Sequence, residues 1–126
     1  MSPCARKPDL VSPIPDATAL QALLGQAVTL HQQGQLTEAD ALYAQVLAQQ
    51  PGNAMAWQLR GVAMAQAGQP AQALPLVDQA LALRPDVAEI HNNRGMVLQQ
   101  LRRFADAVAS HARAAELKPA LLDALN

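Results

Sequence analysis

The side chains best suited to metal binding or nucleophilic chemistry are three histidines and one cysteine, and they are scattered along the chain. His31, His91 and His111 are never three or four residues apart, the spacing at which two ligands meet on one face of a helix. A thiolate zinc site needs more than one cysteine, and no His-Glu-x-x-His pair, glycine-rich phosphate loop or nucleophile motif occurs. The sequence therefore predicts a protein without a catalytic centre, a metal site or a cofactor.

The formal charge of the 126-residue chain is nearly balanced, at −1. Such a chain has no strong field to attract nucleic acid or an anionic membrane surface, and Arg102 and Arg103 are too few to form a basic patch. No segment approaches the roughly 18 apolar residues that a membrane-spanning helix requires. The single cysteine, Cys4, cannot close a disulfide within the chain, which indicates a reducing compartment. We expect a cytoplasmic protein that binds neither nucleic acid nor membranes.

The elements that would position any functional side chain follow from a repeat, because a proline returns every 34 residues, at Pro51, Pro85 and Pro119. A fixed period of this length is typical of arrays of helical repeats. Hydrophobic residues make up 51% of the chain and aromatic residues only 2%, which suits close packing of helices through Ala and Leu better than a β-sandwich or barrel. We expect an all-α solenoid of antiparallel helix hairpins.

Each repeat should contain two short helices joined by a turn. The first helix is predicted from Thr18, where Thr18 and Gln21 can form a capping box, to about Gln33. Gly34 ends this helix, and Thr37 can cap the second one. The pattern then recurs twice and gives five predicted segments: a Pro-rich flexible leader (1–16), three repeats (17–53, 54–87 and 88–119), and a truncated fourth helix or cap stub (120–126).

One residue conflicts with this plan. Pro75 falls inside the helix expected to begin near Ala71, where an interior proline would cost about 3 kcal/mol. Because Pro75 lies so close to the helix start, we expect a mild bend rather than a break.

Small and aromatic residues recur at matching places in the repeats. Trp57 and Gly61 mark the first helix of the second repeat, Tyr43 marks an aromatic position in the first, and an alanine opens each second helix at Ala39, Ala73 and Ala107. Over about residues 19–119 this pattern resembles that of the tetratricopeptide repeat family, W-x-x-L-G-x-x-Y followed by A-x-x-x-F and a closing A and P. The resemblance implies a right-handed α-solenoid of three such motifs, in which Gly61 and Gly95 let one helix cross closely over its partner. The chain departs from the family pattern at Ala27, Arg60, Val77, Arg94, Arg102 and His111.

Two of the histidines fall on positions that carry aromatic residues in other repeats. His91 stands where the second repeat has Trp57, and His111 stands where the first has Tyr43. We therefore expect both to be packing residues with a polar tip.

The resemblance also implies a binding surface, because the first helix of each repeat in this family lines a concave groove that holds an extended or helical segment of another protein. Apart from Glu89, the residues at these positions are apolar or carry amides, which suits a largely apolar peptide or helix. They are Gln21, Leu24, Val28 and Gln32 in the first repeat, Met55, Gln58, Leu59, Val62 and Gln66 in the second, and Glu89, Asn92, Asn93, Met96, Gln99 and Gln100 in the third. The expected function is that of a non-catalytic protein–protein interaction scaffold.

Cochaperone members of the family hold a C-terminal carboxylate with Lys, Asn and Arg residues. This chain has other residues at the matching positions, namely Leu24, Val28, Leu59, Glu89 and Asn93. Because Glu89 would repel a carboxylate, we expect that this clamp does not operate here.

The string His91-Asn92-Asn93-Arg94-Gly95 is similar to repeats that precede O-linked N-acetylglucosamine transferases. Only Asn93 matches the asparagine ladder of those grooves, since Gly25 and Leu59 occupy the same position in the other repeats. An alternative function is therefore a substrate-recognition arm of a larger enzyme.

Two further possibilities concern the ends of the chain. Apolar residues around Val108, Ala112 and Leu121 would form an exposed end of the array, which favours homo-oligomerisation. The leader carries Leu10, Val11 and Ile14 and is apolar enough to lie in the groove.

Overall fold

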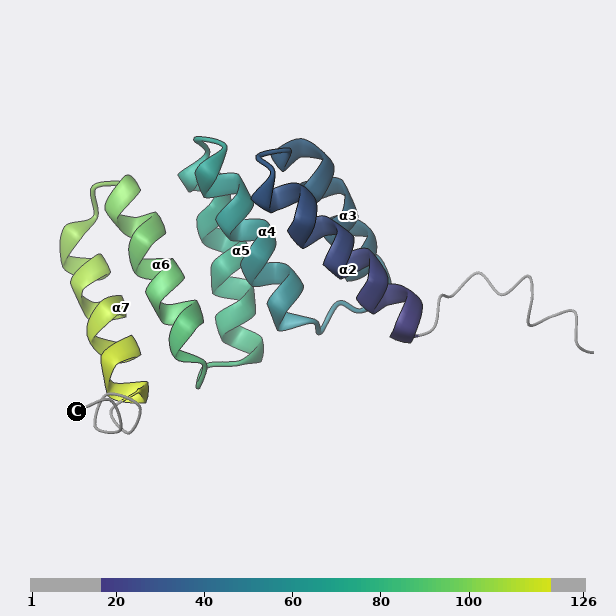
Figure 1. Cartoon of the computed structure of the whole chain (residues 1–126). Helices are drawn as coiled ribbons and strands as arrows, with labels where there is room; N and C mark the ends of the chain where they lie inside the picture. The colour runs from purple at the N-terminus through teal and green to yellow at the C-terminus, as the bar shows by residue number, and fades with distance from the viewer. Residues whose placement is uncertain (1–16, 119–126) are drawn as a thin grey trace, which may run out of the picture.

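The computed structural model describes residues 17–118, and within this range the chain forms six α-helices and no strand (Figure 1). They are α2 (Ala17–Gln32), α3 (Leu36–Gln49), α4 (Ala54–Gln66), α5 (Pro70–Leu83), α6 (Ala88–Gln100) and α7 (Phe104–Leu117). Helices α2 and α3, α4 and α5, and α6 and α7 form antiparallel hairpins that stack in order. The expected all-α repeat solenoid is confirmed. The predicted leader (1–16) and fourth helix (120–126) lie outside the described residues.

The turn inside each hairpin has the same backbone geometry. Gly34 and Gly68 have φ of 83° and 84°, and Arg102 occupies the same position in the third hairpin with φ of 63°. Each turn is closed by a hydrogen bond from the next amide to a carbonyl five residues earlier, as in a Schellman motif: Gln35 to Leu30 (2.9 Å), Gln69 to Met64 (3.0 Å) and Arg103 to Leu98 (2.9 Å). Glycine adopts this left-handed conformation freely, whereas an arginine there costs about 1 kcal/mol.

Two predicted helix caps are wrong. Helix α2 already includes Ala17, so Thr18 lies in its first turn, and α3 begins at Leu36, so Thr37 lies inside the helix and no side chain caps it. The hairpin turns fix the starts of the second helices, which begin 34 residues apart at Leu36, Pro70 and Phe104. A side-chain cap does form on α4, where Asn53 Oδ1 accepts a hydrogen bond from the Ala56 amide at 3.0 Å.

Helix α5 continues through Pro75, which confirms that this proline does not break it. The helix begins at Pro70, one residue before the expected start. Proline is well suited to that first position, because its fixed φ is already helical and its missing amide would have no partner there. Pro75 is exposed, so its ring does not displace a packed neighbour.

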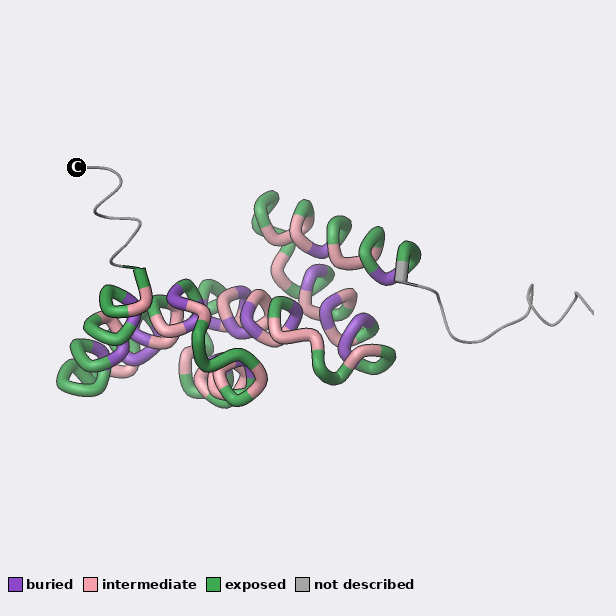
Figure 2. The backbone as a smooth tube through the Cα atoms, turned by 90° about the horizontal axis from the view of Figure 1, so that it is seen from below, coloured by how far each residue is buried: buried purple, intermediate pink, exposed green. Residues whose placement is uncertain are grey.

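The core follows the junctions between helices (Figure 2). Buried residues gather in three clusters, each of which joins one hairpin to the next: Ala27, Ala39, Tyr43 and Ala63; Val46, Leu47 and Ala56; and Ala65, Ala73, Val77, Ala80, Ile90 and Val97. Seven of these thirteen positions are alanine, and small side chains let the helix backbones approach closely.

The glycines at the helix crossings have the role predicted for them. A Cβ atom added to Gly61 would lie 2.6 Å from Val77 Cγ2 and 3.2 Å from the Ala73 carbonyl oxygen. A Cβ added to Gly95 would lie 2.6 Å from His111 Nε2. In both hairpins the absence of a side chain lets the first helix rest directly on the second.

Candidate functional site

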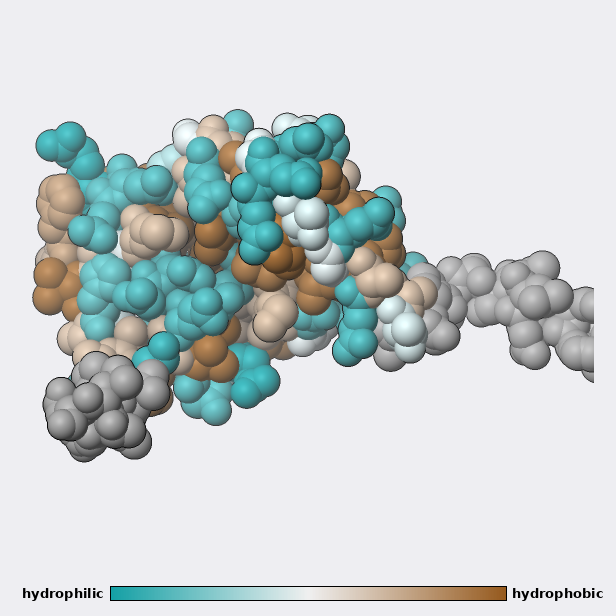
Figure 3. Space-filling view, in the orientation of Figure 1, coloured by the Kyte–Doolittle hydropathy of each residue, from teal (hydrophilic) through white to brown (hydrophobic). Residues whose placement is uncertain are grey.

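The first helices of the three hairpins form one continuous face, because α4 contacts both α2 and α6. Helix α2 lies in front of α3 in Figure 1, and Figure 3 shows the same side, with hydrophobic surface lying between hydrophilic groups. The predicted groove residues therefore come from neighbouring helices.

The apolar part of this face has a packed floor and two projecting side chains. Leu24, Val28 and Leu59 are half-buried, because they pack against the cluster that contains Ala27 and Tyr43. Val62 is also half-buried. The methionines reach further into solvent: Met55 is 56% exposed and Met96 is 37% exposed. Their flexible thioether side chains are the groups on this face that can adapt to the shape of a ligand.

Gln58 differs from the expectation that it presents its amide to a partner, since it is only 5% exposed. It lines a small cavity of about 120 Å³ between the second and third hairpins, together with Met55, Arg84, Val87 and Ile90. The following hairpin covers this position, and the spacing of residues in a single helix cannot reveal that.

Two amides at the edge of the face, those of Gln66 and Gln100, already bind a neighbouring repeat. Gln66 Oε1 lies 2.8 Å from His31 Nε2, and His31 Nδ1 lies 3.0 Å from the Tyr43 hydroxyl. Burial raises the pKa of Tyr43 to about 12, so its hydroxyl keeps its proton. In the tautomer that carries its proton on Nε2, His31 accepts a hydrogen bond at Nδ1 from that hydroxyl. His31 then donates from Nε2 to Gln66. At the next junction Gln100 Nε2 donates to the Ala65 carbonyl oxygen at 3.5 Å.

His31 belongs to this group but was not among the predicted groove residues. The repeat does predict its contact, because His31 precedes Tyr43 by 12 residues, as the groove residue Gln99 precedes His111 two repeats later. In the third hairpin His111 Nε2 lies 3.2 Å from Gln99 Oε1, and its Nδ1 lies 2.7 Å from Asn92 Oδ1. Asn92 and Gln99 are therefore held in place by the second helix of their own repeat.

His91 has the packing role expected from its position. Its Nε2 donates to the Pro85 carbonyl oxygen at 2.8 Å, as Trp57 Nε1 donates to the Pro51 carbonyl oxygen at 2.8 Å one repeat earlier. Within residues 17–118 no group of three or more His, Cys, Asp or Glu side chains could hold a metal ion.

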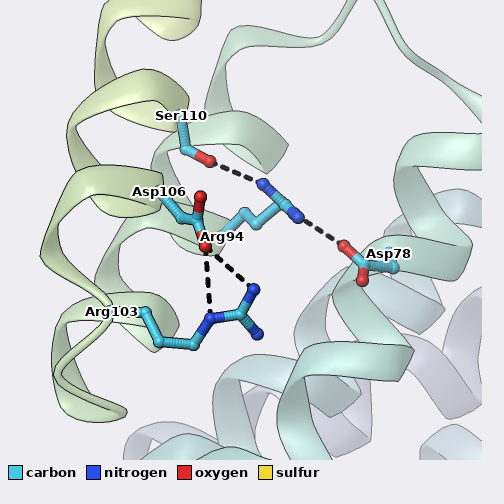
Figure 4. A network of polar contacts seen from close by, with 5 residues as sticks. All are labelled: Asp78, Arg94, Arg103, Asp106 and Ser110. Carbon is cyan, nitrogen blue, oxygen red and sulfur yellow. Dashed lines mark hydrogen bonds and ion pairs between the residues drawn. The ribbon is translucent and has the colours of Figure 1, made fainter.

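Two arginines that depart from the family pattern form ion pairs between repeats. Arg60 Nε lies 2.7 Å from Asp40 Oδ1, and Arg94 Nε lies 2.7 Å from Asp78 Oδ1. Figure 4 shows Arg94 reaching from α6 to Asp78 on α5 and also to the Ser110 hydroxyl on α7, at 3.0 Å. Besides these arginines, Glu89 is the one Asp, Glu, Lys or Arg residue on α2, α4 and α6.

The helices of the described region are all too short or too polar to cross a membrane.

The fold is shared with several solved structures. The first TPR of Spaghetti (RPAP3), solved with the HSP90 peptide SRMEEVD bound, is 22% identical, with 86% of each chain covered and a TM-score of 0.79. The Sgt2 TPR domain from Aspergillus fumigatus is 18% identical, with 86% of this chain and 71% of that chain covered and a TM-score of 0.78. MamA from Desulfovibrio magneticus RS-1 is 21% identical with a TM-score of 0.72; 79% of this chain is covered but only 56% of that one. At these identities the likeness shows the fold alone.

A comparison with curated proteins gives no match. The family is shown instead by a match to its sequence pattern. The sequence pattern described as "Tetratricopeptide repeat" matches residues 16–54, 24–69 and 59–121, three overlapping segments that span most of the chain. Together with the three stacked hairpins and their crossing glycines, this match establishes that the chain belongs to the tetratricopeptide repeat family.

Proposed function

We propose that this chain is a non-catalytic protein-interaction module whose face on α2, α4 and α6 binds a largely apolar peptide or helix. The observation that carries the proposal is the pair of exposed methionines, Met55 and Met96, on a face with a single unpaired acidic residue, Glu89. Adaptable apolar side chains above a packed floor suit helix-in-groove or extended-peptide binding.

The charge of the face supports an apolar ligand over an acidic one. The first TPR of Spaghetti was solved with SRMEEVD, a peptide with three acidic residues. This chain has no cation where the family's carboxylate clamp has its binding residues, and Arg60 and Arg94 are engaged with Asp40 and Asp78. A carboxylate in this groove would lose its hydration shell without gaining a charged partner, while Glu89 would repel it.

The proposal is tested with peptides selected from a displayed library on the full chain. We expect the selected peptides to be rich in Leu, Ile, Phe or Met, and to bind equally well with a free or an amidated C-terminus. The double variant M55E and M96E should weaken their binding at least about tenfold, because it places two charges on the binding surface. Both side chains project into solvent, so the variant should keep its helical circular dichroism.

The matched control is Gln45→Glu, which adds one negative charge at an exposed position of α3. Gln45 lies on a second helix, away from the proposed face, so this variant should bind as the wild type does. Equal weakening by the control and the double variant, or a strong preference for acidic peptides with a free C-terminus, would show that the binding face is wrongly assigned.

The enzyme-arm alternative rests on Asn93, which is half-buried on α6 at the position of the asparagine ladder. It uses the same groove, so peptide binding does not separate the two functions. The gene sequence distinguishes the two functions. A reading frame that continues past Asn126 into a catalytic domain would favour the substrate-recognition arm of an enzyme. For either function we place the protein in the cytoplasm, since its lone Cys4 suits a reducing compartment.

A further inference from the structure

One face of α7 is apolar and is not covered by any described residue. Phe104 is 55% exposed and Val108 is 67% exposed, and these are two of the four large hydrophobic residues that the described region exposes. Ala112 follows at the same four-residue spacing, and Ala115 completes the stripe. We call these four residues, Phe104, Val108, Ala112 and Ala115, the α7 stripe.

In the earlier hairpins the corresponding face is an interface. Phe104 and Val108 stand two periods after Leu36 and Asp40 of α3. Leu36 packs against the cluster that contains Ala63 of α4, and Asp40 binds Arg60 of α4, so α4 covers this side of α3. Helix α6 covers α5 in the same way. The α7 stripe therefore continues an established packing surface beyond the last described helix.

The charges show that α7 does not suit another helix of the same kind. At both inner junctions an aspartate on the second helix binds an arginine on the next helix: Asp40 binds Arg60, and Asp78 binds Arg94. On α7 the positions of these two aspartates are occupied by Val108 and Ala112. An incoming helix with arginine at that position would bury a guanidinium against apolar groups, which is unfavourable. The stripe requires a neutral, apolar partner.

We propose that the α7 stripe binds the same stripe on a second copy of this chain, with the two α7 helices antiparallel about a two-fold axis. The stripe is self-complementary, since its large residues lie in the first half of the helix and its small ones in the second. Antiparallel pairing places Phe104 opposite Ala115 and Val108 opposite Ala112 of the other copy. Each large side chain then packs over a small one, and the contact closes on itself.

The opposite end of the array does not offer an equivalent surface. The outward positions of α2 that correspond to the junction residues of α4 and α6 are Ala22, Gln26, Thr29 and Gln33, and all four are exposed. This face is mostly polar, so it does not match the α7 stripe. The pairing of α7 with α7 is favoured over head-to-tail stacking, and the assembly stops at a dimer.

The charged residues of α7 do not oppose this pairing. Asp106 binds Arg103 and Glu116 binds Arg113, each three residues away along the chain. The groove face belongs to α2, α4 and α6, so dimerisation through α7 leaves it open on both copies. A dimer would carry two binding faces and would bind a partner with two target segments more tightly than a monomer does.

The dimer should be weak. Helix α7 has 14 residues, which corresponds to about 21 Å of helix. One pair of such helices buries less area than a standard stable interface, so we expect a dissociation constant on the order of 100 μM. Sedimentation equilibrium of the full chain from micromolar to millimolar concentration covers this range.

Two substitutions test the assignment. Val108→Glu places a charge in the centre of the stripe and should raise the dissociation constant at least tenfold, while its circular dichroism stays unchanged because Val108 is already exposed. Gln79→Glu adds the same charge at an exposed position of α5 and should dimerise as the wild type does.

Disulfide trapping tests the antiparallel orientation, in a Cys4→Ser background. A mixture of Phe104→Cys and Ala115→Cys chains should oxidise to the mixed disulfide. Each variant alone should not, because a residue near one end of α7 lies far from its own copy. Homodisulfides in excess of the mixed product would overturn the antiparallel arrangement.

Three results would overturn the proposal as a whole. They are a wild-type chain that stays monomeric at millimolar concentration, growth into open-ended polymers, and a dimer that Val108→Glu leaves intact. A chain that dimerises only after removal of residues 119–126 would also contradict it, because that segment would then be the occupant of the stripe.

Discussion

Changing glycine to alanine should have opposite effects on stability at Gly61 and Gly25. Both residues lie inside first helices, α4 and α2, and alanine is favoured over glycine in a helix by about 1 kcal/mol. At Gly25 an added Cβ meets no atom within 4 Å. Gly25→Ala should therefore stabilise the fold by about 0.5–1 kcal/mol.

At Gly61 the same methyl group has no room. The added Cβ would lie 2.6 Å from Val77 Cγ2, 3.2 Å from the Ala73 carbonyl oxygen and 3.3 Å from the Val77 amide nitrogen. Val77 is fully buried, and the β-branched side chain cannot rotate freely out of the way. Two of the contacts are with backbone atoms, so α4 and α5 must move apart. Overpacking of this kind costs about 1–3 kcal/mol, which exceeds the gain in helix propensity.

The measurement is thermal unfolding of the three proteins followed by circular dichroism. In a domain of this size 1 kcal/mol corresponds to a shift of roughly 4–8 °C in Tm. Gly25→Ala should raise the Tm by a few degrees and Gly61→Ala should lower it by about 5–10 °C. If both variants shift the Tm in the same direction, the close crossing of α4 over α5 is not what requires glycine at position 61.

Three further predictions concern the turns, the junctions and the buried tyrosine. Arg102→Gly should raise stability by about 0.5–1 kcal/mol in chemical denaturation, because Arg102 has the left-handed φ of 63° that glycine adopts at positions 34 and 68. Arg94→Ala should cost about 1 kcal/mol, since the ion pair with Asp78 is half-exposed, and a double-mutant cycle with Asp78→Ala at low and high salt should show a coupling that salt weakens. Tyr43 is the chain's one tyrosine, so ultraviolet absorbance follows it directly and should show no tyrosinate at pH 10 while the protein is folded. Its pKa is raised from 10.0 to about 12 by burial, so the stability it contributes is complete below pH 10 and falls as the pH rises through 12. Unfolding that is insensitive to pH between 10 and 12 would contradict the burial of this hydroxyl.

The sequence was sufficient for the array because the repeat applies the same constraints three times. The prolines mark one place in all three repeats, and the turn glycines and the crossing glycines each mark one place in two of them. Agreement between copies outweighs an ambiguous signal in any one of them. Local rules were less successful. Thr18 and Thr37 are good capping residues, yet both lie inside their helices, and the start of α3 is set by the hairpin turn.

The polar contacts between repeats could not be predicted from the period. Arg60 and Arg94 occupy the same position in successive repeats, but their partners do not, since Asp40 lies 20 residues before Arg60 and Asp78 lies 16 residues before Arg94. Each arginine reaches a different turn of the preceding helix. The burial of Gln58 could not be predicted from the sequence either, because it depends on how closely the third hairpin packs on the second.

These junction contacts also explain why the candidate groove is nearly neutral although its helices carry arginines. Each inner junction has an ion pair and also a hydrogen bond between first helices: His31 with Gln66, and Gln100 with the Ala65 carbonyl. The ion pairs hold Arg60 and Arg94 against the preceding repeat, and the amides bridge the groove edges. Among the apolar residues of this face, the exposed methionines are then the most available to a ligand. On α7, valine and alanine replace the junction aspartates, and this replacement leaves an apolar stripe. Replacing the aspartate at either of these two positions thus separates a closed junction from a surface that is open to a second copy.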